Sequence, residues 1–179
     1  MVMFPSKNGI KILILTSFFA ILTYIGALIQ VPMYPAPISL QTLFVMFAGL
    51  LLGSKYGVLS QLLYIFLGLL GLPIFTGGGG IGYVLTPTFG FIIGFLPLAY
   101  FSGFAKGNNF KVISMLLLGN LILYCIGITY LWFILNKIAG NDLSLITLLK
   151  GMTIYLPGDL LKIFITIPIA LKIRKRLNI

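Results

Sequence analysis

Two oppositely charged residues inside one apolar stretch are the part of this sequence best suited to chemistry. Asp159 and Lys162 lie between Lys150 and Lys172, an interval that as a helix would cover ~33 Å, about one bilayer core. Their spacing puts both side chains on one helical face, where they could pair. A charge at that depth is costly unless it is paired or faces a cavity, so the pair predicts a polar site within a membrane.

The residue types favour binding over catalysis. A carboxylate beside an ammonium group suits a small amphipathic acid that carries N–H groups, an anionic or carbonyl oxygen and a hydrocarbon part. The chain has no histidine and no Cys/His metal-ligand set, so we expect no catalytic residue, no bound metal and no cofactor. Two plainer interpretations stay open: a self-satisfied ion pair, or Asp159 as a first-turn cap of a late-starting helix.

The elements that hold this pair must be membrane spans. The chain of 179 residues is 60% hydrophobic and only 8% charged, which leaves too few polar side chains to cover a soluble domain. We expect an all-α membrane protein with a single integral domain, residues 1–179. The apolar runs predict transmembrane helices over 11–30, 39–54, 56–72, 89–105, 112–135 and 152–171, of which the second and third are short.

The basic residues predict the orientation. An N-in, C-in arrangement of six helices puts most Lys and Arg on the cytoplasmic side of a bacterial inner membrane, so the net charge of +10 reflects topology rather than nucleic-acid binding. The outward loops are then 31–38, 73–88 and 136–151. The first of these follows span one and is called loop 1, and the second follows span three and is called loop 3. Both are uncharged and rich in Pro or Gly. Irregular backbone near a bilayer must pack on protein or line a cavity, so we expect both to fold over a ligand pocket.

Two further patterns in the sequence have a simple explanation beside a functional one. The glycine run 77–80 is not followed by Gly-Lys-Ser/Thr, so it favours a flexible loop or close backbone approach to a ligand over phosphate binding. Small residues recur along the first span, and they suit either packing within the bundle or docking to a partner helix. They are Thr16, Ala20, Thr23 and Ala27.

Four segments, in order along nearly the whole chain, resemble the BioY proteins, which are biotin-binding S components of energy-coupling factor (ECF) transporters. They are PISLQTLFVMFAGLLLG from Pro37, SQLLYIFLGLLGLPIF from Ser60, GGGGIGYVLTPTFGFIIGF from Gly77, and PGDLLK from Pro157. The resemblance implies the S-component fold, an outward-facing biotin pocket closed by loop 1, and high-affinity biotin uptake without enzyme activity. It also implies a transmembrane coupling protein and two ATPase subunits as partners, although some members are thought to work with few or none.

The resemblance also assigns residues. Asp159 and Lys162 match the family's PGDxxK element, which agrees with their selection by depth and spacing. Asp159 is expected at the ureido N–H groups, and Lys162 at either the valerate carboxylate or the ureido oxygen. Further ligand contacts are expected at Gln41, Gly82, Tyr83 and Thr88.

Two positions depart from the family pattern. The usual Gly-Pro-Thr-Gly-Gly-Tyr element is replaced here by residues 86–91, and Phe89 is expected to reshape the pocket rim. The alanine pair four apart on the first span appears as Ala20 and Tyr24, the expected partner-docking positions, where the large Tyr24 would crowd the interface.

The rival interpretations of the function are an S component for another vitamin, a membrane-embedded enzyme and a non-transporting assembly subunit.

Overall fold

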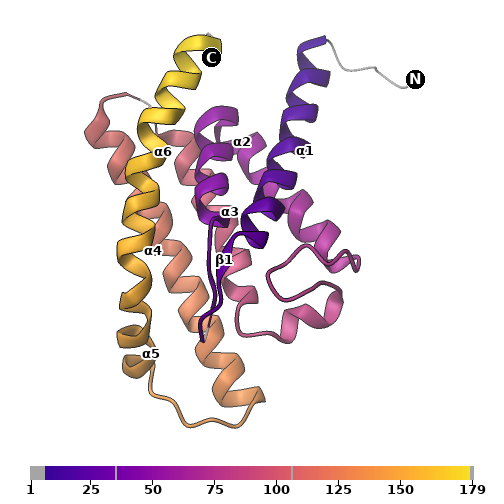
Figure 1. Cartoon of the computed structure of the whole chain (residues 1–179), viewed down its shortest axis with the longest axis vertical. Coiled ribbons are helices and arrows are strands. Elements are labelled where there is room, and N and C mark those ends of the chain that lie inside the picture. The colour runs from indigo at the N-terminus through magenta and orange to yellow at the C-terminus, as the bar shows by residue number, and fades with distance from the viewer. Residues whose placement is uncertain (1–6, 35, 106, 178–179) are drawn as a thin grey trace.

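The computed structural model describes residues 7–34, 36–105 and 107–177; the other positions of the predicted 1–179 domain lie outside the described residues. Its long helices form one elongated bundle, in which the start of α1 and the end of α6 lie at the same extremity (Figure 1). These helices are α1 (Lys7–Leu28), α2 (Gln41–Leu69), α3 (Phe89–Phe104), α4 (Asn109–Phe133) and α6 (Leu156–Leu177). The shorter elements are β1 (Gln30–Val31), β2 (Ile38–Ser39), η1 (Ile81–Leu85), η2 (Ile134–Ile138), α5 (Leu145–Met152) and η3 (Thr153–Tyr155).

The helices carry the surface expected of a bilayer protein. Among the described residues, four helical segments are long and apolar enough to cross a membrane, and α3 is a shorter apolar helix; the four are Gly9–Leu28, Gln41–Leu69, Asn109–Ile138 and Leu145–Ile173. Large apolar side chains such as Ile14 and Phe164 point outward and are 63% and 64% exposed. Such a surface is stable against lipid chains rather than water.

Helix α2 folds back on itself at Gly53. The φ of 82° and ψ of 171° at Gly53 are not helical. Beyond it, a Cβ built on Gly57 would lie 2.8 Å from the Gly49 Cα, and the Gln41 Nε2 donates to the Tyr64 hydroxyl at 2.8 Å. In a straight helix Gln41 and Tyr64 would be ~35 Å apart. The helix is therefore a hairpin, whose arms over 41–52 and 54–69 overlap the predicted segments 39–54 and 56–72.

Small residues bring the tip of this hairpin onto α3. A Cβ on Gly49 would lie 2.3 Å from the Ala99 carbonyl oxygen, and one on Gly103 would lie 2.1 Å from the Ser54 backbone nitrogen. Helices in membranes pack closely where small residues face one another. The first arm of α2 is consequently the most enclosed part of the bundle, with Val45, Met46 and Ala48 fully buried.

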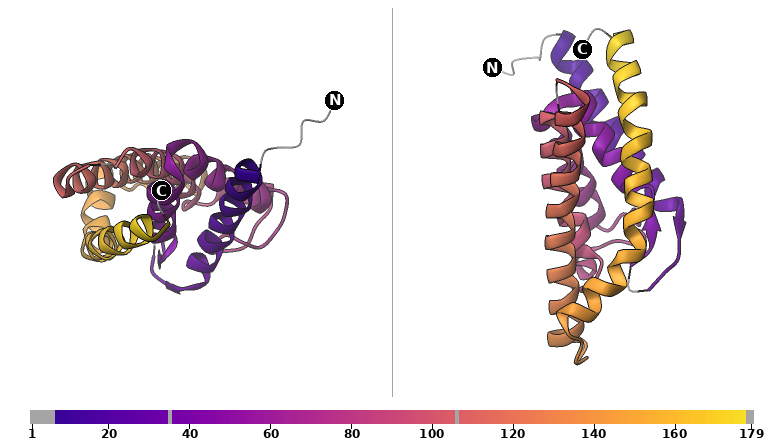
Figure 2. Two further views of the ribbon diagram at one scale, coloured as in Figure 1. Left: turned by 90° about the horizontal axis from the view of Figure 1, so that it is seen from above. Right: turned by 90° about the vertical axis from the view of Figure 1, so that its left-hand side faces the viewer.

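Two connecting segments pack back against the helices. Strands β1 and β2 pair antiparallel, with Gln30 opposite Ser39, and their ribbon lies beside the lower half of α6 (Figure 2). The segment from 70 to 88 returns to the hairpin, where the Gly80 N–H donates to the Gly68 carbonyl at 2.7 Å. The Gln30 Nε2 joins the two segments through the Thr76 carbonyl at 3.3 Å.

The third connection differs from the prediction of a loop over 136–151. Helical backbone continues through the π turn η2 to Ile138 and resumes in α5. The Ser144 hydroxyl accepts from the Thr147 N–H at 3.1 Å, a side-chain cap that starts α5. Helix α6 starts at Leu156, which places Asp159 in its first turn.

Candidate ligand-binding site

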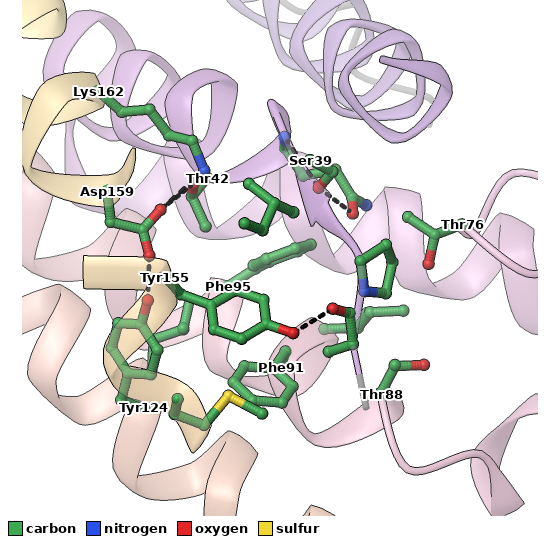
Figure 3. Close-up of a pocket in the computed structure, with 17 residues that line it drawn as sticks. Ser39, Thr42, Thr76, Thr88, Phe91, Phe95, Tyr124, Tyr155, Asp159 and Lys162 are labelled. Atoms are coloured by element: carbon green, nitrogen blue, oxygen red, sulfur yellow. Dashed lines mark hydrogen bonds and ion pairs between the residues drawn. The ribbon is translucent and has the colours of Figure 1, made fainter. Parts of the chain in front are cut away.

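A small cavity lies between the β1–β2 ribbon and helices α2, α3, α4 and α6 (Figure 3). Its volume is about 70 Å³ in this structure. Most of the wall is apolar, and its members include Ile38, Phe91, Ile92, Phe95, Leu123 and Met152. A few polar groups converge on this apolar space, which is the usual composition of a small-molecule site.

Asp159 and Lys162 form one wall of the cavity. The Lys162 Nζ donates to the Asp159 Oδ1 at 2.7 Å and to the Thr42 hydroxyl at 3.0 Å. Their side chains are only 13% and 9% exposed. The carboxylate also benefits from its place in the first turn of α6, where the helix dipole favours negative charge. The pair is thus self-satisfied, as one plainer interpretation allowed, and it also faces open space.

Two hydroxyl groups also hydrogen-bond the Asp159 carboxylate. The Thr42 hydroxyl lies 3.3 Å from the Asp159 Oδ1, and the Tyr124 hydroxyl donates to the Asp159 Oδ2. Figure 3 shows Asp159 between Lys162 and Tyr124. Both carboxylate oxygens therefore have protein donors, so a ligand that binds Asp159 must share or replace one of them.

The structure brings Gln41 and Thr88 to the same cavity. The Gln41 side chain is 4% exposed, and its Oε1 accepts from the Ser39 hydroxyl at 2.9 Å. The Thr88 hydroxyl is 3.1 Å from the Tyr83 hydroxyl, which is in turn 3.2 Å from the Thr76 hydroxyl. These contacts fix the side of the cavity opposite Asp159.

The other predicted contacts lie elsewhere. Tyr83 is buried behind Thr76 and Thr88 and is not part of the lining. Gly82 is exposed, with open space where a Cβ would be. Phe89 is buried among Phe75, Tyr83 and Tyr130 rather than at the rim. Thr88 and Phe91 supply the lining from this part of the chain because Phe89 turns into the core.

The first span packs inward with its small residues. Ala20 is 4% exposed and belongs to the main core, and Tyr24 packs against that core while partly exposed. Thr23, fully buried, hydrogen-bonds Gln61 of the second α2 arm at 3.3 Å. This arrangement favours the interpretation of packing within the bundle, and a partner would not reach Ala20 in this conformation.

Sequence reasoning missed Thr42, Tyr124 and Tyr155, which all line the cavity. Tyr124 lies 35 positions before Asp159, and no pattern in its apolar helix sets it apart from the other tyrosines. Thr42 follows the predicted contact Gln41 in the chain, so the first turn of α2 supplies both residues to the lining. Tyr155 comes just before the Pro-Gly-Asp element, and its hydroxyl donates to the Ala36 carbonyl of the ribbon.

Comparison with known proteins gives one family for this chain. Residues 3–179 match the model of the BioY family. A "Probable biotin transporter BioY" of Lysinibacillus sphaericus is 44% identical over 131 residues, which cover 69% of this chain and 66% of that protein. A protein of the same description from Pyrococcus horikoshii is 39% identical over 149 residues, which cover 83% of this chain and 86% of that protein.

A solved structure is similar over almost the whole fold. It is described as the S-component for biotin from an ECF-type ABC transporter, and it is 30% identical in sequence. The superposition has a TM-score of 0.84 and covers 96% of this chain and 95% of the other. This chain and the solved protein therefore have the same overall fold.

Proposed function

Because this chain belongs to the BioY family, we propose that it captures biotin and takes it up across the membrane as the substrate-specific component of an ATP-driven ECF transporter. It is a multi-pass membrane protein and a transporter rather than an enzyme. The observation that carries the proposal is the buried Asp159–Lys162 pair, which is hydrogen-bonded within the protein yet lines a largely apolar cavity.

The chemistry of biotin suits the groups around this cavity. The two ureido N–H groups need acceptors, and the Asp159 carboxylate supplies them. The Lys162 ammonium supplies a donor for the ureido oxygen or the valerate carboxylate. The fused rings and the valerate chain are mostly hydrocarbon, which Phe91, Phe95 and Leu123 would cover. Gln41 and Thr88 offer polar contacts at the opposite side.

We assign ATP hydrolysis to partner subunits, a transmembrane coupling protein and two ATPases. The glycine run 77–80 lacks the Gly-Lys-Ser/Thr of a nucleotide-binding loop. Tight capture and easy release oppose each other in one fixed site, so release needs an energy source. The exposed apolar face of α1, rather than the buried Ala20, is the more accessible part of that helix for docking.

The proposed topology has six spans, with both ends on the cytoplasmic side of a bacterial inner membrane. The two arms of α2 count as separate crossings, and the distribution of Lys and Arg supports the orientation. The cavity, which residues 36–38 line on this side, then opens outward, which is where biotin arrives.

Thermal unfolding of the detergent-purified chain against a panel of vitamins tests this function. Biotin should stabilise the protein by about 2.7 kcal/mol at a free concentration one hundred times Kd, because it binds only the folded state. The other vitamins should leave the melting temperature unchanged. A response to a different vitamin would replace the substrate, and no response to any of them would support the assembly-subunit interpretation.

The bond between Tyr155 and the ribbon gives a second prediction. Tyr155→Phe removes the hydrogen bond to the Ala36 carbonyl, and one such bond is worth about 0.5–1.5 kcal/mol. Biotin should therefore dissociate roughly 2- to 12-fold faster, as measured by chase of radiolabelled ligand. The matched control is Tyr130→Phe, which loses a similar bond to the Val84 carbonyl away from the cavity lining. Equal dissociation rates for parent and Tyr155→Phe would exclude a closing role for this bond.

A further inference from the structure

A second hollow lies on the other side of the Asp159 carboxylate. It is a groove of about 530 Å³ between α4 and α6. Its apolar walls come from Leu117, Leu118, Leu121, Leu156, Leu160 and Ile163. Tyr124 and Asp159 line both this groove and the cavity. The hydrogen bond between their side chains therefore lies in the wall that separates the cavity from the groove.

Asn120, one of the residues that line the groove, has an unused buried acceptor. Its side chain is 6% exposed, and its Nδ2 donates to the Leu116 carbonyl at 2.9 Å and approaches the Met46 sulfur at 3.6 Å. Its Oδ1 is the buried side-chain polar atom that has no hydrogen-bond partner within the described part of the chain. A buried acceptor left in this state is unfavourable, and a donor that reaches it would be stabilised.

The donor nearest along α4 is the hydroxyl of Tyr124. Residues four apart on a helix are neighbours on one face, and an aromatic side chain leans toward the preceding turn. Asn120 is four positions before Tyr124, and both line the groove. A rotation of Tyr124 away from the cavity would therefore carry its hydroxyl toward the Asn120 Oδ1.

The size of the cavity gives a reason for this rotation. Its volume of about 70 Å³ is well below the ~300 Å³ or more of typical ligand pockets. At least one wall must move when a molecule the size of biotin enters. Tyr124 borders the groove on its other side, where the exposed leucines face lipid, so lipid chains rather than protein would give way to its ring.

We propose that the Tyr124 hydroxyl alternates between two acceptors, Asp159 in the free protein and Asn120 when ligand is bound. The inference rests on the proposed function, because biotin N–H groups are what replace the hydroxyl at the Asp159 Oδ2. Tyr124 is then a positioning residue that selects for ligands with N–H donors. A molecule of similar shape without them cannot displace the hydroxyl and is excluded.

A double-mutant cycle tests the exchange with the full chain in detergent, by titration calorimetry with biotin. Asn120→Leu should raise Kd about 5- to 10-fold in the Tyr124 background, because the displaced hydroxyl loses its acceptor. In a Tyr124→Phe background the same change should leave Kd unaltered. Tyr124→Phe alone should lower Kd, since the ligand no longer competes with a hydroxyl. Equal effects of Asn120→Leu in both backgrounds would overturn the proposal, as Asn120 would then act by packing alone.

A spectroscopic measurement covers the case in which Asn120→Leu fails to fold. With 3-fluorotyrosine at position 124 of the otherwise unchanged chain, the ¹⁹F resonance should move when biotin saturates the site. An unmoved resonance would contradict the rotation. Failure of the parent chain to bind biotin would refute the proposed function itself, whereas binding with an additive cycle would refute only the exchange of acceptors.

Discussion

Replacing Asp159 by asparagine should weaken biotin binding by about 1–3 kcal/mol, a rise in Kd of roughly 5- to 150-fold. Asparagine keeps the size of the side chain but loses the charge that strengthens hydrogen bonds from ligand N–H groups. The folded state should also lose about 3–5 kcal/mol, because the Lys162 side chain, 9% exposed, would stay buried without its carboxylate. Titration calorimetry and thermal unfolding measure the two effects separately.

A second replacement separates these two effects. Asp159→Asn combined with Lys162→Met removes both charges, and the stability should largely return because no unpaired charge stays buried. Binding should not return, since the ligand still lacks its charged partners. Gly82→Ala is the matched control for the predicted site, as open space adjoins Gly82 and the residue lies outside the cavity lining. If the double replacement restored binding, or the single one left it intact, the site assignment would be wrong.

Gly103→Ala should destabilise the fold by about 1–3 kcal/mol, the usual cost of overpacking a tight interface. The added Cβ would lie 2.1 Å from the Ser54 nitrogen and 2.3 Å from its Cα. Both are backbone atoms at the tip of the α2 hairpin, so no side-chain rotation can relieve the contact. A lower midpoint of thermal unfolding in detergent is the expected measurement.

The control for this change is Gly151→Ala in α5. A Cβ on Gly151 would have no neighbour within 4 Å, and alanine favours a helix over glycine by up to about 1 kcal/mol. That variant should melt at the parent temperature or slightly above it. Equal melting of the Gly103→Ala variant and the parent would show that the hairpin tip can move away from α3.

Part of the site could be predicted because its residues are close together in the sequence. Asp159 and Lys162 are three positions apart, and their depth in an apolar stretch marks them before any tertiary structure is known. The partners of Asp159 could not be found in this way. Thr42 and Tyr124 reach it from positions 117 and 35 residues earlier, and their proximity exists only once α2, α4 and α6 have packed.

The same distinction applies to the fold. The break between the predicted segments 39–54 and 56–72 can be predicted because Lys55 interrupts the apolar run. The helix that begins after Ser144 was missed because its cap lies in a segment with charged and polar residues, which the prediction treated as loop. The expected ligand contact Tyr83 instead packs its ring against Phe75 and Phe89 in the core.

The reversal at Gly53 also bears on how the protein enters the bilayer during synthesis. Its arms of 12 and 16 residues would measure ~18 and ~24 Å, less than the ~30 Å hydrocarbon layer that a lone helix must cross. Neither arm is therefore an adequate insertion signal alone. We therefore expect the two arms to insert together and to stay beside α1 until α3, the next helix to be made, encloses them.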